Sequence, residues 1–496
     1  MKKLLVLLCM TFIYILTFSL NVNAESYNYS PLSEVIYSAE AMNVINVIDS
    51  ANLVDEAANH PDVVFGELVD VFGFGDKVFL VDKTNSCIHV LSQAFEYLAT
   101  FGNIGEETLR SPQGIFVTED AIYVADTLHY RVAIFNHAYE FISEINVPND
   151  PTFKQSPEDE QGYDFKPLGI AVHKTGRVYV IADQIFEGIL DFNPDGSFSR
   201  YVGANTVTLS LWDAFWLKLT SEEQRKAQGY RLATTFKNVN IDDMGYLYTV
   251  SGLNEGERVI KKLNYKGIDV LSRNGYIPQN GDSVVIPEDL VVPNGPSQFI
   301  DIDVNDYGNY IVLDSARGRI FTYDFEGNLL YVAGQLGNLT EENSYERDTF
   351  LNPTALTFYD NKVLAVDSLN KNLVVFGYTD FGLLVNQAIE HYYQGDYQAA
   401  KDSWEDVLIL NTNYYLAYSG IAKAELRTGN YERAMEYAKL GYDDYTFSSA
   451  YQPYRYQQLV VIVPFIIGGA MVIIIYSFFK NIKRAVNRAR EEEDFE

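Results

Sequence analysis

The segment IYVADTLHYRVAIF at 122–135 holds the pattern that decides the fold: a short apolar strand, an aspartate, a loop and another strand. The pattern occurs six times, and the other copies read VFLVDKTNSCIHV (78–90), VYVIADQIFEGILDF (178–192), LYTVSGLNEGERVIKKL (247–263), YIVLDSARGRIFTYD (310–324) and VLAVDSLNKNLVVFG (363–377). The residues at the strand ends are Asp82, Asp126, Asp183, Ser251, Asp314 and Asp367. They lie roughly 44 to 68 residues apart, which fits four strands per unit plus insertions.

Turn residues stand between the strands, where antiparallel hairpins need them, at 193–196, 243–245, 306–308 and 325–327. Short strands with regular turn signals predict an all-β repeat. Six such units predict a closed six-bladed β-propeller, because closure removes the exposed sheet edges. We expect the strand MNVINVI at 42–48, within an N-terminal closing segment at 25–59, to complete the last blade.

The residues ahead of three strand ends carry a family resemblance. SPQGI at 111–115 leads to Asp126, KPLGI at 166–170 leads to Asp183, and NPTAL at 352–356 leads to Asp367. Through these residues the region from roughly 60 to 380 resembles the NHL-repeat propellers. The resemblance implies the propeller fold and leaves the function open, because one fold hosts many functions. The fourth unit departs from the pattern with Ser251.

The repeated aspartates have two candidate roles, as a ring of metal ligands or as acceptors of backbone N–H bonds in their own loops. Repetition in every unit favours the second role, because a binding site rarely needs six copies of one ligand. The sequence DVND at 303–306 resembles the start of a calcium loop but lacks the downstream Glu, so we predict a turn. His89, His129 and His173 fall on a strand, in a loop and at a turn. We therefore expect no metal site and no cofactor.

Three insertions interrupt the repeat, at 149–165, 204–236 and 273–297. In the second insertion, the capping box TSEE at 220–223 predicts the start of a helix. Just before it, Trp212, Phe215 and Trp216 would share one helix face and form a candidate partner surface, since tryptophan is common in interface hot spots. The alternative is that these side chains pack on the propeller as a small satellite core.

From Phe381 the apolar period changes from two to about 3.6, which predicts helices over 381–447. Ala388, Gly395, Tyr397 and Ala400 return 34 residues later as Ala422, Gly429, Tyr431 and Ala434. This is the period of the tetratricopeptide (TPR) repeat, with small residues where helices cross. Trp404 fills the large aromatic position of the first copy. Trp404, Tyr397 and Tyr431 are further candidate partner contacts, and the alternative role is a spacer between propeller and membrane.

Both ends of the chain carry membrane-related signals. Residues 1–24 predict a signal peptide, with two lysines, an apolar core and small residues at its end, although an uncleaved anchor is the alternative. The charge-free run LVVIVPFIIGGAMVIIIYSFF at 459–479, after a juxtamembrane segment at 448–458, is long enough to cross a bilayer. Five cations lie in 480–496, so the positive-inside rule places this tail in the cytoplasm and the propeller at 25–380 outside, as in a type I single-pass protein.

The composition excludes two kinds of site. The net charge of −30 argues against a nucleic-acid binder, which needs a basic face. Of the two cysteines, Cys9 lies in the predicted signal peptide and Cys87 remains alone, so neither an intramolecular disulfide nor an all-cysteine zinc site can form.

No serine-hydrolase elbow, phosphate-binding loop or His-Glu-x-x-His motif occurs in the sequence, so we expect a non-enzymatic protein. The alternatives are a propeller hydrolase of sugar lactones or glycans and a purely structural envelope protein. The order of propeller, TPR pair and membrane helix is similar to that of Gram-positive proteins that occur beside carbohydrate ABC-transporter components. This resemblance, which includes 424–437, implies a membrane-anchored extracellular scaffold with a protein partner, such as a transporter component, or a carbohydrate ligand.

Overall fold

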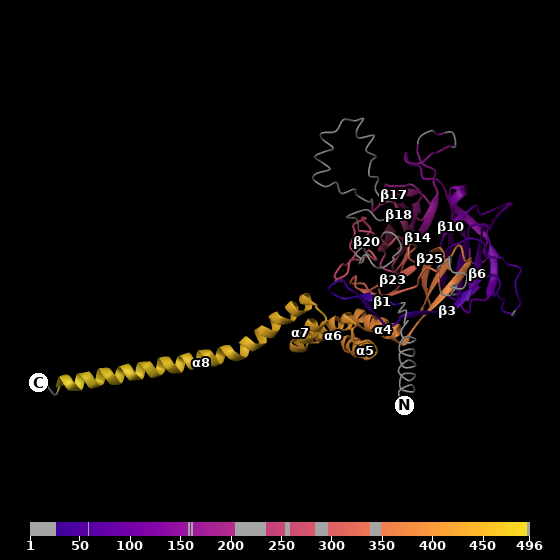
Figure 1. Ribbon diagram of the computed structural model, residues 1–496. Coiled ribbons are helices and arrows are strands. Elements are labelled where there is room, and N and C mark those ends of the chain that lie inside the picture. Colours follow the sequence, from indigo (N-terminus) through magenta and orange to yellow (C-terminus); the bar gives the residue numbers. More distant parts are fainter. Residues whose placement is uncertain are drawn as a thin grey trace, which may run out of the picture. The chain divides into compact units, whose positions relative to one another are not determined.

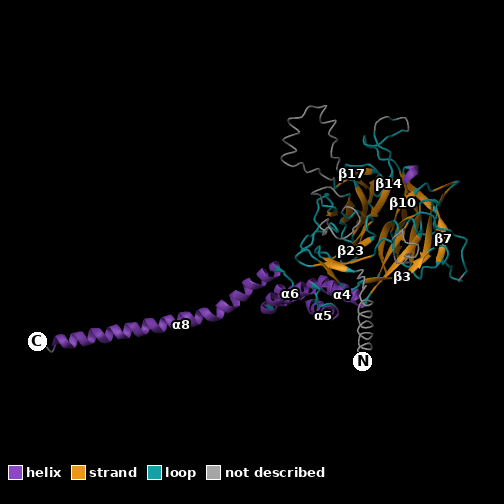
Figure 2. Ribbon diagram, in the orientation of Figure 1, coloured by secondary structure: helices purple, strands orange, loops and turns teal. Residues whose placement is uncertain are grey.

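The repeated segments form six antiparallel sheets, which are the blades of a β-propeller (Figure 1, Figure 2). The structure, a computed structural model, describes residues 26–57, 59–156, 159, 162–203, 235–252, 258–282, 296–337 and 349–493. The chain divides into two compact units, Met1–Leu383 and Leu384–Glu496. The first holds the propeller, and the second holds most of the helical residues.

The first five blades run in chain order from their inner strand to their outer strand, and the sixth takes its outer strand from the N-terminal side. The first three blades consist of β4 (Leu68–Phe74), β5 (Lys77–Asp82), β6 (Cys87–Ser92) and β7 (Tyr97–Phe101), then β10 (Pro112–Val117), β11 (Ile122–Asp126), β12 (Arg131–Phe135) and β13 (Phe141–Ile145), then β14 (Pro167–Val172), β15 (Val178–Ala182), β16 (Ile189–Phe192) and β17 (Phe198–Val202). The other three consist of β18 (Phe236–Ile241), β19 (Leu247–Ser251) and β20 (Ile260–Leu263), then β21 (Phe299–Val304), β22 (Tyr310–Asp314), β23 (Arg319–Tyr323) and β24 (Leu329–Ala333), then β25 (Pro353–Tyr359), β26 (Lys362–Asp367) and β27 (Asn372–Tyr378) with β3 (Met42–Ile48).

The ring closes through its inner strands and through one strand from the N-terminal side. The inner strands of successive blades contact one another, and β25 of the sixth blade contacts β4 of the first. The expected closing strand at 42–48 is present as β3, which pairs antiparallel with β27 so that Ile48 lies opposite Leu373 and Met42 opposite Tyr378. The outer edge of the last blade is thereby covered by a segment that precedes the first blade.

Neighbouring inner strands approach so closely that two positions require glycine. A Cβ at Gly114 of β10 would overlap with the carbonyl oxygen of Leu168 on β14. A Cβ at Gly169 of β14 would overlap with the side chain of Asn238 on β18. The glycines of the SPQG and KPLG segments therefore set the spacing between blades two, three and four.

An N-terminal hairpin lies along the outer strand of blade 5. It consists of β1 (Tyr27–Tyr29) and β2 (Val35–Tyr37), which pair antiparallel. Asn28 Nδ2 donates to the carbonyl oxygen of Leu330 on β24 at 2.9 Å. The remaining short elements of this unit are β8 (Asn103–Ile104), β9 (Glu107–Thr108) and the 3₁₀ turn η1 (Thr127–His129).

The predicted helices of the C-terminal part are α4 (Asp380–Gln394), α5 (Tyr397–Leu410), α6 (Tyr415–Thr428) and α7 (Tyr431–Leu440). Neighbouring helices α5, α6 and α7 pack in order along the chain. Trp404 lies in their core, and a Cβ at Gly420 would overlap with its indole ring, so the small residue makes room for the large one. Helices are therefore present over 381–440, as the change of apolar period predicts, and α5, α6 and α7 pack against one another.

The last element is a single long helix, α8 (Asp444–Glu493), which continues through Pro453 and Pro464. Its section at 459–479 is exposed and is long and apolar enough to cross a membrane. No other helix in the described part of the chain meets that criterion. The predicted juxtamembrane segment at 448–458 and the apolar run therefore belong to one continuous helix. The predicted signal peptide at 1–24 lies outside the described residues.

Candidate functional site

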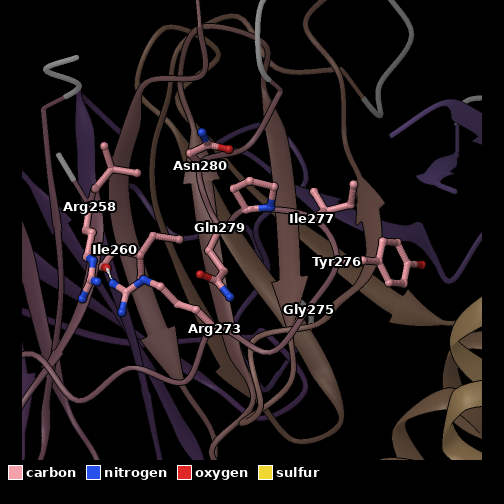
Figure 3. Close-up of a pocket in the computed structure, with 10 residues that line it drawn as sticks. Arg258, Ile260, Arg273, Gly275, Tyr276, Ile277, Gln279 and Asn280 are labelled. Carbon is pink, nitrogen blue, oxygen red and sulfur yellow. Dashed lines mark hydrogen bonds between the residues drawn. The ribbon is translucent and has the colours of Figure 1, made fainter. Parts of the chain in front are cut away.

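A cavity of about 310 Å³ lies at the outer edge of blade 4 (Figure 3). Five blades have four strands, whereas the described part of blade 4 has three. A fourth strand begins where Val270 N donates to Lys262 O at 2.7 Å, and the chain then leaves the sheet. The cavity occupies the place that the rest of that strand would take. It is lined on the sheet side by 258–260 and on the other side by residues from 273–280.

Two arginines carry the charge of the cavity lining. The guanidinium group of Arg273 donates to Leu271 O at 3.0 Å, to Ile260 O at 2.9 Å and to Asp269 Oδ2 at 2.8 Å. Arg258 Nη1 lies 3.5 Å from the same oxygen of Asp269, and the Arg258 side chain is 64% exposed. Figure 3 shows the two guanidinium groups next to each other on one side of the cavity. Among the described residues, one carboxylate, that of Asp269, thus faces two guanidinium groups.

The other wall of the cavity is the segment 273–282, which we call the strap. It crosses from blade 4 to the outer edge of blade 5, where Gln279 Nε2 donates to Gly327 O at 2.8 Å. Tyr276 Oη donates to the carbonyl oxygen of Tyr29 at 3.2 Å and so joins the strap to β1. These bonds fix the wall without any ligand, as expected of a preformed binding pocket.

A buried polar cluster fixes the far end of the strap at Asp282. Tyr27 and Tyr29 both donate their phenol hydrogens to Asp282 Oδ1 at 2.6 Å. Arg317 Nε and Arg319 Nε lie 3.5 and 3.9 Å from Asp282 Oδ2. Burial, together with the negative charge of Asp282, raises the pKa of both phenols, so they remain protonated donors.

Three carboxylates surround the narrow channel at the centre of the ring, and they serve as bonds between blades. Asp70 Oδ2 of β4 accepts the backbone N–H of Ile115 on β10 at 2.8 Å. Asp301 Oδ2 of β21 accepts the backbone N–H of Leu356 on β25 at 2.6 Å. The cavity between the inner strands has a volume of about 20 Å³, which is room for about one water molecule and for no organic ligand.

The third carboxylate, Asp303, repeats this arrangement two residues further along β21. Its Oδ2 accepts the backbone N–H of Phe358 at 2.7 Å and the hydroxyl of Thr357 at 2.9 Å. The amide groups of Asn238 and Asn240 on β18 donate to Asp301 and Asp303, respectively. One strand of blade 5 therefore binds both neighbouring blades through side chains.

Burial raises the pKa of all three channel carboxyl groups. The pKa of Asp301 rises to about 7 and that of Asp303 to about 6, because the charged forms lose their hydration. The pKa of Asp70 rises well above its ordinary range for the same reason, and the charge of Asp301 raises it further. As the pH rises through neutrality, these carboxyl groups therefore ionise, and their ionisation lowers the free energy of unfolding of the propeller.

The strand-end aspartates tie the loop that enters the inner strand of their own blade. Buried carboxylates accept backbone N–H groups from this loop in four blades: Asp82 from Gly66 at 2.6 Å, Asp126 from Arg110 at 2.7 Å, Asp314 from Gln298 at 2.8 Å and Asp367 from Asn352 at 3.1 Å. Asp183 is half-buried and accepts from the side chain of Gln184 at 3.4 Å. The expected structural role is thus present in four of the five copies that carry aspartate.

Two of the three candidate histidines contact the aspartates of their own blades, whereas His173 Nδ1 lies 2.8 Å from Thr175 Oγ1. His89 Nε2 lies 3.3 Å from Asp82 Oδ2 in blade 1, and His129 Nδ1 lies 2.9 Å from Asp126 Oδ2 in blade 2. The described residues contain no group of three or more His, Cys, Asp or Glu side chains that could hold a metal ion.

A cysteine, a histidine and an aspartate also meet in blade 1. His89 Nε2 faces both Asp82 Oδ2, at 3.3 Å, and Cys87 Sγ, at 3.7 Å, while Nδ1 lies 2.8 Å from Thr100 Oγ1. A catalytic triad needs the acid and the nucleophile on different ring nitrogens. Burial, together with the charge of Asp82, raises the pKa of the Cys87 thiol to about 12, so this thiol is not activated.

The predicted partner surface is partly corrected. Trp404 is 2% exposed and stacks near Tyr414 in the helical core, so its large apolar ring is buried rather than available to a partner. Tyr397 and Tyr431 are half-buried near the starts of α5 and α7 and remain candidates. Trp212, Phe215 and Trp216 lie outside the described residues. Sequence reasoning missed the arginine cavity, whose one signal was the departure of the fourth unit from the repeat.

Comparisons with known proteins do not assign this chain to a family. No family model matches the sequence, and no curated protein matches it. A protein of unknown function from Bacteroides thetaiotaomicron is similar over 70% of this chain and 80% of its own, with 11% identity and a TM-score of 0.42. A streptogramin B lyase is similar over 69% of this chain and 100% of its own, with 12% identity and a TM-score of 0.40. A catalytically inactive virginiamycin B lyase from Staphylococcus aureus, solved with quinupristin, shares 9% identity over 72% of this chain and 96% of its own, with a TM-score of 0.38.

Proposed function

We propose that this protein is a membrane-anchored extracellular binding and scaffold protein rather than an enzyme. The observation that supports it best is one chain that combines a propeller bearing a preformed cavity with a C-terminal helix able to cross a membrane. The cations that follow the apolar run favour a cytoplasmic C-terminus and an outside propeller. In this proposal the propeller binds a ligand, and α8 holds it at the cell surface.

The helix pairs would dock a second protein, as TPR repeats do. Their 34-residue offset supports this assignment, and the half-buried Tyr397 and Tyr431 repeat at equivalent positions. The similarity of domain order to proteins encoded beside carbohydrate ABC transporters favours a transporter component or a solute-binding protein as that partner. The protein would then be an accessory component of sugar uptake.

Purification of the native full-length protein in mild detergent, followed by mass spectrometry, tests this function. We expect transporter subunits or a solute-binding protein to co-purify, and a variant with Tyr397 and Tyr431 both replaced by alanine to recover less of them. Purification without any partner would contradict the accessory role. Turnover of a sugar lactone or glycan by the purified protein would instead support the hydrolase alternative.

A further inference from the structure

We propose that the cavity at the edge of blade 4 binds the carboxylate group of a small ligand through Arg258 and Arg273. This inference rests on the proposed binding function and specifies the chemistry of its ligand. Arg258 and Arg273 are the charged residues among the described residues of the lining. Guanidinium groups present parallel N–H donors that match the two oxygens of a carboxylate.

The two arginines have different tasks, which their contacts separate. Arg273 is held by two backbone carbonyl groups and by Asp269, so its position is set by the fold. Arg258 has one long contact of 3.5 Å to Asp269 and a mostly exposed side chain, so its donors are available to a ligand. Arg273 therefore fixes the positive potential of the cavity, and Arg258 makes the direct bond.

The charge of the described residues suits a monoanion. Among them, Arg258 and Arg273 share the carboxylate of Asp269, so two positive charges face one negative charge, and the difference equals the charge of one carboxylate group. A phosphate dianion would leave the cavity negative, within a chain whose net charge is already −30. Because the protein as a whole is acidic, the positive potential at this cavity comes from the two neighbouring arginines rather than from the overall charge.

The rest of the lining limits the ligand's size and character. Val259, Ile277 and Pro278 supply apolar surface, and Gln279 and Asn280 supply amide groups. Figure 3 shows Tyr276 pointing away from the arginine side. A volume of about 310 Å³ is at the lower end for ligand pockets and suits a sugar acid or the C-terminal residues of a peptide. The two sources share the carboxylate chemistry.

Calorimetric titration of the full-length protein in detergent tests the assignment. The probes are glucuronate, with glucose as its uncharged control, and N-acetyl-dialanine, with its C-terminal amide as control. We expect at least one acid to bind and its control to bind at least about tenfold more weakly. Binding of glucuronate alone assigns a sugar acid, and binding of the peptide acid alone assigns a peptide terminus.

Two variants separate a site from general attraction. Arg258→Gln should weaken binding of the acid about tenfold, and higher salt should reduce the difference. Arg110→Gln is the matched control, because Arg110 is an exposed arginine of blade 2, and it should bind as the natural protein does. The proposal would be overturned if Arg258→Gln bound the acid as tightly as the natural protein does. It would also be overturned if an acid and its uncharged control bound equally, or if neither acid bound.

The two proposals fail separately in these experiments. If neither acid binds but a protein partner still co-purifies, the carboxylate site is wrong and the scaffold function stands. If an acid binds in an Arg258-dependent way but no partner co-purifies, the site is supported and the accessory role fails.

Discussion

Replacing Asp301 with asparagine should change how the stability of the propeller depends on pH. Asp301 is 2% exposed, and its carboxylate accepts N–H groups from Ile302, at 2.8 Å, and from Leu356, at 2.6 Å. Burial raises its pKa to about 7, from an ordinary value of 3.8. Because the folded-state pKa is the higher one, the folded protein binds the proton more tightly than the unfolded chain does. Stability is therefore greatest at acidic pH and is lost as the pH rises from about 4 through about 7.

The size of the effect follows from the two pKa values. At pH 8 the ionised Asp301 lowers the free energy of unfolding by about 4 kcal/mol, whereas at pH 5 the same group lowers it by about 1.5 kcal/mol. Asparagine cannot ionise, so it removes this pH-dependent cost. It also presents an amide hydrogen where a second acceptor is needed, which costs about 1–3 kcal/mol at every pH. Relative to the natural protein, the variant should gain about 2.5 kcal/mol between pH 5 and pH 8.

Guanidinium unfolding of the full-length protein in detergent, followed by near-ultraviolet circular dichroism, measures this difference. At pH 5 we expect Asp301→Asn to be about as stable as the natural protein or less stable, and at pH 8 to be more stable by about 1–3 kcal/mol. The control is Asp120→Asn, which changes an exposed carboxylate of blade 2 and should alter neither curve. The reasoning is refuted if the difference in unfolding free energy between Asp301→Asn and the natural protein is the same at both pH values. It is also refuted if this difference changes in the opposite direction.

Three further substitutions or deletions test the fold and the anchor. Gly114→Ala should destabilise the propeller by about 1–3 kcal/mol, because its methyl group overlaps with Leu168 O, and an unchanged unfolding midpoint would contradict this close approach. Trp404→Ala should cost the helix pairs about 3–5 kcal/mol, seen as loss of helical circular dichroism at lower temperature, and a neutral result would mean that the indole is not in the core. Deletion of 459–479 should move the protein from the membrane fraction to the soluble fraction, and retention in membranes after carbonate washing would argue against the single-helix anchor.

The propeller could be predicted because its signals are local and repeated. Strand-end aspartates mark five of the six blades, and four of them accept backbone N–H groups from the loop that enters the blade. The closing strand at 42–48 followed from the need to cover an exposed edge, and β3 covers it. The change of apolar period at Phe381 likewise predicts helices, and α4 to α7 are present there because an amphipathic helix carries its own local signal.

The cavity and the channel carboxylates could not be predicted from such signals. The cavity exists because the chain leaves blade 4 after Val270, and leaving a sheet is a tertiary event that strand periodicity does not report. Asp301 and Asp303 alternate with apolar residues in one strand. From the sequence alone, such aspartates are expected in a turn or on an exposed face. Their actual position, between two blades and bonded to Leu356 and Phe358, depends on contacts more than fifty residues away. Trp404 shows the converse error, since its size suggests an interface but equally suits a core.

The same loop ties explain why the cavity is preformed. Asp314 holds the entrance to blade 5 at Gln298, as its counterparts do elsewhere. Next to it, Ser297 Oγ accepts the backbone N–H of Asp282 at 2.9 Å, so the far end of the strap is joined to this fixed entrance. Blades 3 and 4 follow the insertions at 149–165 and 204–236. The strand end of blade 3 carries the half-buried Asp183, and that of blade 4 carries the buried Ser251, whose hydroxyl donates to Val259 O at 3.5 Å. The insertion at 273–297, which lines the cavity, thus differs from the other two, because it leads into blade 5, whose Asp314 holds the entering loop through a backbone hydrogen bond. Because the wall is held by bonds that do not involve Arg258, replacing that side chain should remove a ligand contact and leave the cavity itself intact.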